Sequence, residues 1–212
     1  MSGVPLPETF PLAEIILRTG DARAGLEALQ RLLVTSKLDE EPDILPLFRN
    51  YPHLCALFSR VYFIDQAWAR LAFRCELTIG FFRADLVVAD LHRNHYLLVE
   101  FEHGHADSIF TTGGRSTPAW SKTFERGYSQ IVDWFWWLAR NSESGPYPRL
   151  FPRAMPTISG LLVIGRDIPE QETELRERLA WRMLKTRVDS HEIYLSTYDE
   201  LYRALRSNLQ AM

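Results

Sequence analysis

Hydrophobic and polar residues change their spacing along this chain of 212 residues. Up to about residue 62, apolar positions recur every three or four residues, as on one face of an amphipathic helix. From residue 75 to residue 102 they form three short runs rich in β-branched and aromatic residues, which predicts an antiparallel meander. Helical and strand-like stretches alternate after residue 117. We therefore expect an α/β protein whose mixed sheet is flanked by helices.

Residues 1–72 are predicted to be an N-terminal helical segment, or appendage, of the main domain. Within it, residues 1–20 begin with prolines and are expected to form a loose arm that leads into a helix. Asp21 is a candidate N-cap for the helix that follows. Prolines interrupt a second helical stretch at residues 43–61.

Residues 73–212 are predicted to form the main domain. After the meander, Thr117 is the expected N-cap of a helix that ends near Arg140. Three elements are expected next: a strand at 160–166, a helix at about 169–187 and a strand at 192–196. Thr197 and Glu200 have the spacing of a capping box that begins the last helix.

Composition limits the classes of function. The net charge of −3 and the pI near 6.1 exclude a polybasic nucleic-acid binder, so any DNA contact must come from a local patch. Arginine outnumbers lysine by 21 to three, which suits bidentate phosphate contacts but is equally explained by genomic base composition. No apolar run approaches the roughly 18 residues of a membrane span, and the beginning lacks a signal-peptide pattern. With two cysteines at no metal-like spacing, we expect a soluble cytoplasmic protein.

Three acids occupy positions where a buried sheet would place apolar side chains: Asp85, Glu100 and Glu102. Because successive strand residues face opposite sides, Glu100 and Glu102 share one face, and the turn between the strands brings Asp85 alongside. Converging carboxylates repel one another unless a cation lies between them, and oxygen ligands suit Mg²⁺ or Mn²⁺. Such a site can hydrolyse phosphodiesters. The alternative is that the acids are solvated on a half-exposed sheet.

The pattern as a whole resembles the PD-(D/E)XK nuclease superfamily, with Asp85 as the first acid and residues 100–102 as the second motif. More closely, residues 75–206 resemble the nuclease domain of the Shedu anti-phage proteins. In that family the strand acid is followed by a helix with Q, W and L, an "IGR" strand and a "TYDEL" helix. The corresponding residues here are Gln130, Trp134 and Leu138, then Ile164 to Arg166, then Thr197 to Leu201.

This resemblance implies a restriction-endonuclease-like fold and metal-dependent cutting or nicking of DNA in phage defence. It implies Asp85 and Glu100 as ligands of Mg²⁺ or Mn²⁺, Gln130 as a residue that orients the site, and assembly into a homo-oligomer. The family's lysine is Glu102 here, which can serve as a general base or a further ligand. In either role, the positive charge that the family's lysine would have carried comes instead from Lys122 or a second metal. Otherwise the site is inactive, and the chain is a nucleic-acid-binding or scaffold protein.

Four basic residues are predicted DNA contacts: Arg115, Arg178, Arg182 and Lys185. Arg115 lies in the loop 111–117, which can hold a phosphate through backbone amides or is a flexible connector. The other three lie in a basic stretch at 175–187, which is either a solvated helix face or a contact with the DNA backbone.

Two further features have competing interpretations. His103 and His105 directly follow the acidic motif and either extend the metal site towards a softer ion or are polar residues at a strand exit. The aromatic run at 134–137 covers nearly a full helical turn, so most of its rings are expected to pack against protein rather than stack on bases.

Overall fold

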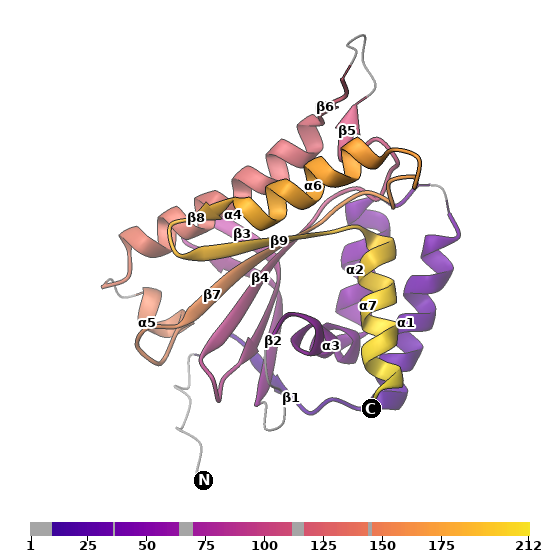
Figure 1. Cartoon of the computed structure of the whole chain (residues 1–212). Helices are drawn as coiled ribbons and strands as arrows, with labels where there is room; N and C mark the ends of the chain where they lie inside the picture. The colour runs from indigo at the N-terminus through magenta and orange to yellow at the C-terminus, as the bar shows by residue number, and fades with distance from the viewer. Residues whose placement is uncertain (1–9, 36, 64–69, 112–116, 144–145) are drawn as a thin grey trace.

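A seven-stranded mixed sheet in the order β1-β2-β3-β4-β7-β9-β8 forms the centre of the molecule (Figure 1). The structure, a computed structural model, describes residues 10–35, 37–63, 70–111, 117–143 and 146–212. The strands of the sheet are β1 (Ala13–Ile15), β2 (Leu71–Ile79), β3 (Phe82–Asp90), β4 (His95–Phe101), β7 (Thr157–Val163), β8 (Arg187–Val188) and β9 (His191–Ser196). A separate ribbon pairs β5 (Phe110–Thr111) with β6 (Ala119–Trp120).

The direction of the strands changes at β4. Neighbouring strands from β1 to β4 are antiparallel, in agreement with the predicted meander, whereas β4, β7 and β9 are parallel. Parallel neighbours need a crossover connection, and a helix provides it between β4 and β7. The ends of β4 and β7 therefore lie side by side, and this edge carries the acidic motif.

Helices cover both faces of the sheet. The helical elements are α1 (Thr19–Leu33), the π-helical turn η1 (Glu40–Ile44), α2 (Leu45–Asn50), α3 (Pro52–Tyr62), α4 (Lys122–Arg140), α5 (Pro146–Leu150), α6 (Thr173–Lys185) and α7 (Tyr198–Gln210). Helices α1, α2, α3 and α7 lie on one face, and α4 and α6 lie on the other (Figure 1). The predicted mixed α/β fold with N-terminal helices is confirmed.

Alternation along the strands divides the core into two layers. Leu98 packs in the layer under α4, whereas Val99 packs in the layer under α1, α3 and α7. The aromatic run in α4 is mostly core, as expected: Trp134, Phe135 and Trp137 are buried, and Trp136 is exposed. Large rings on one side of α4 fix the helix over β4, which positions its polar residues at the edge of the sheet.

Several predicted boundaries were wrong. Residues 13–15 form strand β1 rather than the approach to a helix, because the free edge of β2 offers backbone partners that a short apolar run cannot reveal. The N-cap of α4 is Ser121, whose hydroxyl accepts a hydrogen bond from the Phe124 amide. Thr117 is not the cap, because the next residues pair in the ribbon β5–β6.

Two helices also begin elsewhere than predicted. Helix α1 begins at Thr19, and Asp21 lies inside its first turn, where it pairs with Arg18 at 2.9 Å instead of capping. Helix α6 begins later than predicted, at Thr173, and it ends earlier, at Lys185, because β8 pairs with β9 directly after it. The capping box of Thr197 and Glu200 at the start of α7 is confirmed.

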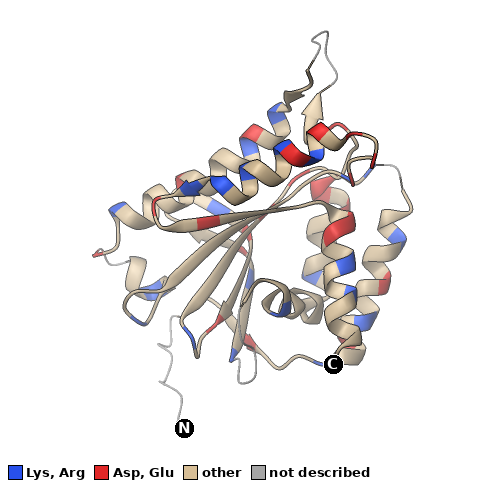
Figure 2. Cartoon of the chain, in the orientation of Figure 1, with Lys and Arg blue, Asp and Glu red and all other residues tan. Residues whose placement is uncertain are grey.

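The predicted boundary after residue 72 falls inside β2 and stays a prediction. No helix among the described residues is long and apolar enough to cross a membrane. Acidic and basic residues are mixed along α4 and α6 (Figure 2).

Candidate active site

Strands β3 and β4 bring Asp85 and Glu100 together. The last paired residues of these strands are Leu86 and Val99, so the next step of the register sets Asp85 beside Glu100. Both residues are 5% exposed, on the face of the sheet under α4. The amide of Phe101 donates a hydrogen bond of 2.8 Å to the Asp85 carboxylate, which fixes that side chain across the two strands.

The two acids line an open pocket of about 460 Å³, here called the acid pocket. Its remaining lining residues are Glu40, Phe81, Phe82, Arg83, Arg126 and Gln130. They come from η1, the β2–β3 hairpin and α4, so the pocket exists only once the helices have packed against the sheet.

The pKa values of both acids are raised. Burial raises the pKa of Glu100 to about 10, with further contributions from Asp85 and Glu102. Burial also raises the pKa of Asp85 to about 7, partly opposed by the hydrogen bond from Phe101. A buried pair of carboxylates without enough positive charge is the environment that a divalent cation stabilises. Asp85 and Glu100 therefore fit the oxygen-ligated metal that the sequence predicts.

Gln130 of α4 connects the two strands at the pocket. Its amide nitrogen donates to the Glu100 carboxylate at 3.0 Å and to the Arg83 carbonyl at 3.2 Å. A side-chain amide held by the backbone of β3 restricts the orientation of Glu100 on β4. This is the geometry expected of a residue that orients a metal ligand.

Glu102 is fully buried and is held by an arginine. Arg126 donates from two guanidinium nitrogens to the two Glu102 oxygens, at 2.9 Å and 2.5 Å. Gly127 permits this approach, because a Cβ there would lie 2.8 Å from the Glu102 side chain. Among the described residues, Asp85, Glu100 and Glu102 do not form a group with ligand oxygens within 4.8 Å of one another. The structure thus pairs Glu102 with Arg126 of α4, and of the three predicted acids only Asp85 and Glu100 line the acid pocket.

Sequence reasoning missed Arg126 and Glu40. Arg126 stands four residues before Gln130, so it shares that helix face, and this spacing was the available signal. It faces Glu40 as well, at 3.7 Å. Glu40 lies 60 residues from Glu100 in the chain, and no local pattern links them. Lys122, the predicted source of positive charge, is exposed at the start of α4 and does not line the acid pocket.

The residue opposite Asp85 on the neighbouring strand, Glu76, has a strained backbone conformation. Glu76 of β2 has φ 54°, a left-handed conformation that is uncommon for residues other than glycine and that concentrates at functional sites. Its carboxylate pairs with Arg49 at 2.5 Å and with Arg83 at 3.0 Å. These two pairs hold β2 against the rim of the acid pocket.

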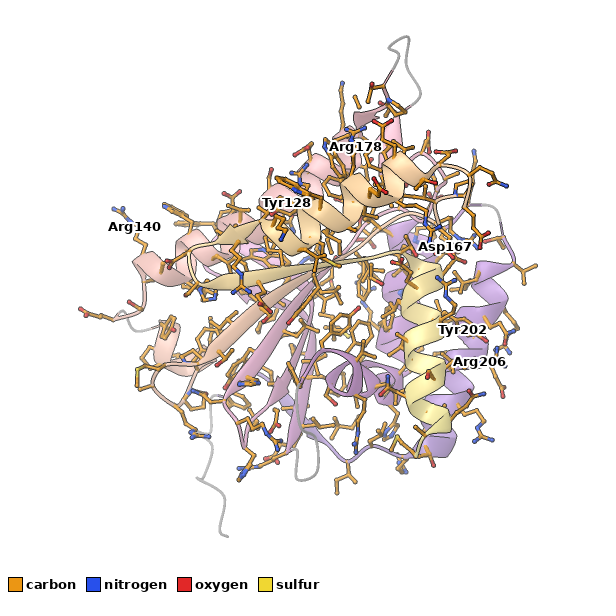
Figure 3. The ribbon with its side chains drawn as sticks, viewed as in Figure 1. Tyr128, Arg140, Asp167, Arg178, Tyr202 and Arg206 are labelled. Atoms are coloured by element: carbon orange, nitrogen blue, oxygen red, sulfur yellow. The ribbon has the colours of Figure 1, made fainter. Side chains whose placement is uncertain are left out.

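Three of the four predicted DNA contacts lie in the described part of the chain. Arg178 donates to the Pro118 carbonyl at 2.8 Å, and Arg182 makes a two-pronged contact with Glu125 while its guanidinium lies 4.4 Å from the Tyr128 ring centre. Figure 3 shows Arg178 and Tyr128 in the layer of α4 and α6. Lys185 is exposed, and Arg115 lies outside the described residues. Arg182 thus joins α6 to α4, and Arg178 joins α6 to the β5–β6 ribbon, where its guanidinium also lies over the rings of Phe110 and Trp120.

The "IGR" and "TYDEL" motifs meet at a pair here called the arginine clasp, which consists of Arg166 and Asp199. Arg166 donates to both Asp199 oxygens at 2.8 and 2.9 Å, and to the carbonyls of Leu33 and Thr35 at the end of α1. Next to it, the Tyr198 hydroxyl donates to the Glu102 carbonyl at 2.6 Å. These motif residues hold α1 and α7 against the acidic strand.

His103 and His105 turn away from the acid pair and meet Asp39, which precedes η1. The three residues form a group whose possible metal-binding atoms lie within 4.8 Å of one another. The sequence could not place Asp39 here, because 64 residues separate it from His103.

Comparison with known proteins assigns the chain to a family. A search of curated proteins gives no match. The family described as "Shedu protein SduA, C-terminal" matches residues 38–202, a span that begins next to Asp39 and Glu40 and includes both acids, Gln130 and the arginine clasp. The chain therefore belongs to the family of the C-terminal region of the Shedu protein SduA.

Proposed function

We propose that the chain is a Mg²⁺-dependent DNA endonuclease or nickase of a Shedu-type anti-phage system. The observation that carries the proposal is the acid pocket, in which two buried carboxylates with raised pKa values share one open cavity with two arginines and a glutamine. Perturbed titratable groups that converge in a pocket are typical of catalytic sites. Family membership supports the same activity.

The residues of the acid pocket have separate tasks in this proposal. Asp85 and Glu100 would hold Mg²⁺ or Mn²⁺, which supplies charge for activating water and stabilising the phosphate. Gln130 keeps Glu100 in position. Arg126, 59% exposed and held by Glu102, presents its guanidinium to the cavity and supplies the positive charge of the absent lysine.

DNA is the proposed substrate, with Arg83 and Arg126 at the pocket as phosphate contacts. The predicted contacts Arg115, Arg178, Arg182 and Lys185 remain predictions. Self-assembly belongs to the proposal, supported by exposed apolar side chains at Trp136 of α4 and at Trp181 and Leu184 of α6. Light scattering coupled to size exclusion would measure the number of subunits.

The test is cleavage of supercoiled plasmid by the full chain. We expect nicking or cutting in Mg²⁺ or Mn²⁺ and none in EDTA, because the acids alone offer no electrophile to a phosphate. Asp85→Asn and Glu100→Gln should each lower the rate by at least about 10²-fold, the scale of losing one group that stabilises the transition state. Glu27→Gln, at an exposed position on α1, is the matched control. Equal cutting with and without metal would remove this mechanism.

A second candidate is a non-catalytic nucleic-acid-binding or scaffold protein. The observation that favours it is the engagement of both Glu102 oxygens by Arg126, which leaves no free base at the position of the family's lysine. Wild-type protein that binds DNA and Mn²⁺ but never cuts would support this candidate.

A further inference from the structure

We propose that Asp39, His103 and His105 form a second metal site, for a borderline divalent ion of the Zn²⁺ class. The site is separate from the acid pocket and has a different donor set. It contains two imidazoles and one carboxylate, whereas Asp85 and Glu100 supply only oxygen. Nitrogen donors favour transition metals over Mg²⁺.

The spacing of the donor atoms fits such an ion. The Asp39 Oδ1 atom lies 2.9 Å from His105 Nε2 and 3.6 Å from His103 Nδ1. Four ligands at about 2.0–2.1 Å in a tetrahedron lie about 3.3–3.4 Å apart, so the two measured distances bracket the ideal edge. Three protein ligands leave one position for water or a phosphate oxygen.

One donor atom of the site has no hydrogen-bond partner among the described residues. His103 Nδ1 is buried and accepts or donates no hydrogen bond within the described part of the chain, although Asp39 lies nearby. The two imidazole rings are stacked, with centres 5.3 Å apart and planes 20° apart, and one nitrogen of each ring faces the same Asp39 oxygen. A metal would satisfy the unpaired nitrogen, and unpaired buried polar atoms are rare in native proteins.

The backbone holds all three ligands in advance. The Gly104 amide donates to the Leu38 carbonyl at 2.8 Å, which fastens the loop after β4 to the segment before η1. The Asp39 amide donates to Asp43 at 2.9 Å, and the His105 amide donates to Ser108 at 3.1 Å. A Cβ on Gly104 would lie 2.9 Å from Leu38, so the two segments are in close contact. Binding therefore needs little ordering of the chain.

The site adjoins the acid pocket through neighbouring residues. Asp39 precedes Glu40, which lines the pocket, and His103 follows Glu102, which holds Arg126. A metal at the histidines would fix the segment 37–40 against the end of β4, and with it the carboxylate of Glu40. The ion thus has a positioning role towards the pocket.

The experiment measures metal binding rather than cutting. Metal-free full-length protein is titrated with Co²⁺, and then with Zn²⁺ in competition, in a large excess of Mg²⁺ that fills the acid pocket. Visible absorption of Co²⁺ and calorimetry are the readouts. Wild type, Glu100→Gln and His92→Gln should each bind one Co²⁺ with similar affinity, because His92 is exposed in the β3–β4 turn and Glu100 is not a ligand.

His105→Gln and Asp39→Asn should weaken Co²⁺ binding by at least about 10-fold. Zn²⁺ should raise the melting temperature of wild type and not of these two variants. Two variants are used so that one that fails to fold does not decide the result. The proposal is overturned if wild type binds no Co²⁺, if both variants bind as wild type does, or if Glu100→Gln removes binding. Because no step requires cleavage, an inactive nuclease would leave the result interpretable.

Discussion

The acid pocket holds carboxylates of strands β3 and β4, the arginine clasp holds a carboxylate in the first turn of α7, and the two sites differ in how the charge is balanced. In the clasp, burial opposes ionisation of Asp199, but hydrogen bonds from Arg166 still lower its pKa. In the pocket, burial raises the pKa of Glu100, and among the described residues its carboxylate accepts a side-chain hydrogen bond from the Gln130 amide and from no arginine. A carboxylate paired with an arginine stabilises the fold, whereas two neighbouring carboxyl groups without such a partner can bind a cation.

The same contrast exists on one strand. Glu100 and Glu102 are two residues apart on the same face, yet in the described part of the chain an arginine donates hydrogen bonds to Glu102 and a glutamine donates one to Glu100. The two glutamates therefore allow the effect of an arginine partner to be tested on one strand. The following experiments alter one side of the comparison at a time.

The largest effect is expected at Arg126. If its guanidinium supplies the missing positive charge, Arg126→Ala should lower the cleavage rate by about 10²-fold, and Arg126→Lys should retain part of it. Lys122→Ala is the matched control, because Lys122 is exposed on the same helix and does not line the pocket. If Lys122→Ala loses activity and Arg126→Ala does not, then Lys122 supplies the positive charge, as the sequence predicted.

Glu102 should respond together with Arg126. Glu102→Gln keeps the shape but removes the charge that holds Arg126, so turnover should fall by about 10²-fold, the scale also expected for a general base. In the double variant with Arg126→Ala, the losses should not add if the two residues act as one unit. An inactive wild type that gains cutting on Glu102→Lys would show instead that the site decayed when the lysine was lost. Plasmid cleavage in Mg²⁺ and Mn²⁺ measures all of these.

A smaller effect, on stability, is expected at the arginine clasp. Arg166→Ala removes the partner of Asp199 and two contacts to the end of α1, in a pair whose side chains are 22% and 19% exposed. The free energy of unfolding should fall by about 2 kcal/mol, less than for a fully buried pair. Urea denaturation measures it. Cleavage per folded molecule should change little, and a loss as large as that of Glu100→Gln would mean that the clasp is part of the site.

The opposite sign is expected for the pocket acids. Glu100→Gln should leave the metal-free protein as stable as wild type or about 1 kcal/mol more stable at neutral pH, because a buried carboxyl whose pKa is raised to about 10 must take up a proton on folding, whereas glutamine need not. Thermal melting in EDTA measures this, with Glu27→Gln as the reference. Melting well below wild type would show that Glu100 is structural.

The pH dependence sharpens the same comparison. The pKa values of Asp85, about 7, and of Glu100, about 10, lie above their ordinary values near 4. The folded state therefore keeps protons that the unfolded state has released, and the stability that these groups contribute is full below about pH 4 and is lost as the pH rises through 7 and then 10. Unfolding in EDTA from pH 6 to pH 10 should show a flatter decline for Glu100→Gln than for wild type. Parallel curves would contradict the raised pKa.

The sequence by itself determined the meander, the alternation of core and acidic residues on β4, the capping box of α7 and the burial of most of the aromatic run. These features depend on residue periodicity, which the chain carries locally. Family membership followed from motifs that are likewise readable along the chain.

Only the tertiary structure decided how the acids are partnered. Arg126 reaches Glu102 because Gly127 lets α4 approach the sheet, and Glu40 and Asp39 meet the end of β4 because the N-terminal helices pack on its other face. The short strand β1 also formed because β2 had a free edge. Such contacts join residues that are far apart in the chain, and the free energy that selects them comes from burial and from pairing charges, neither of which leaves a local period in the sequence.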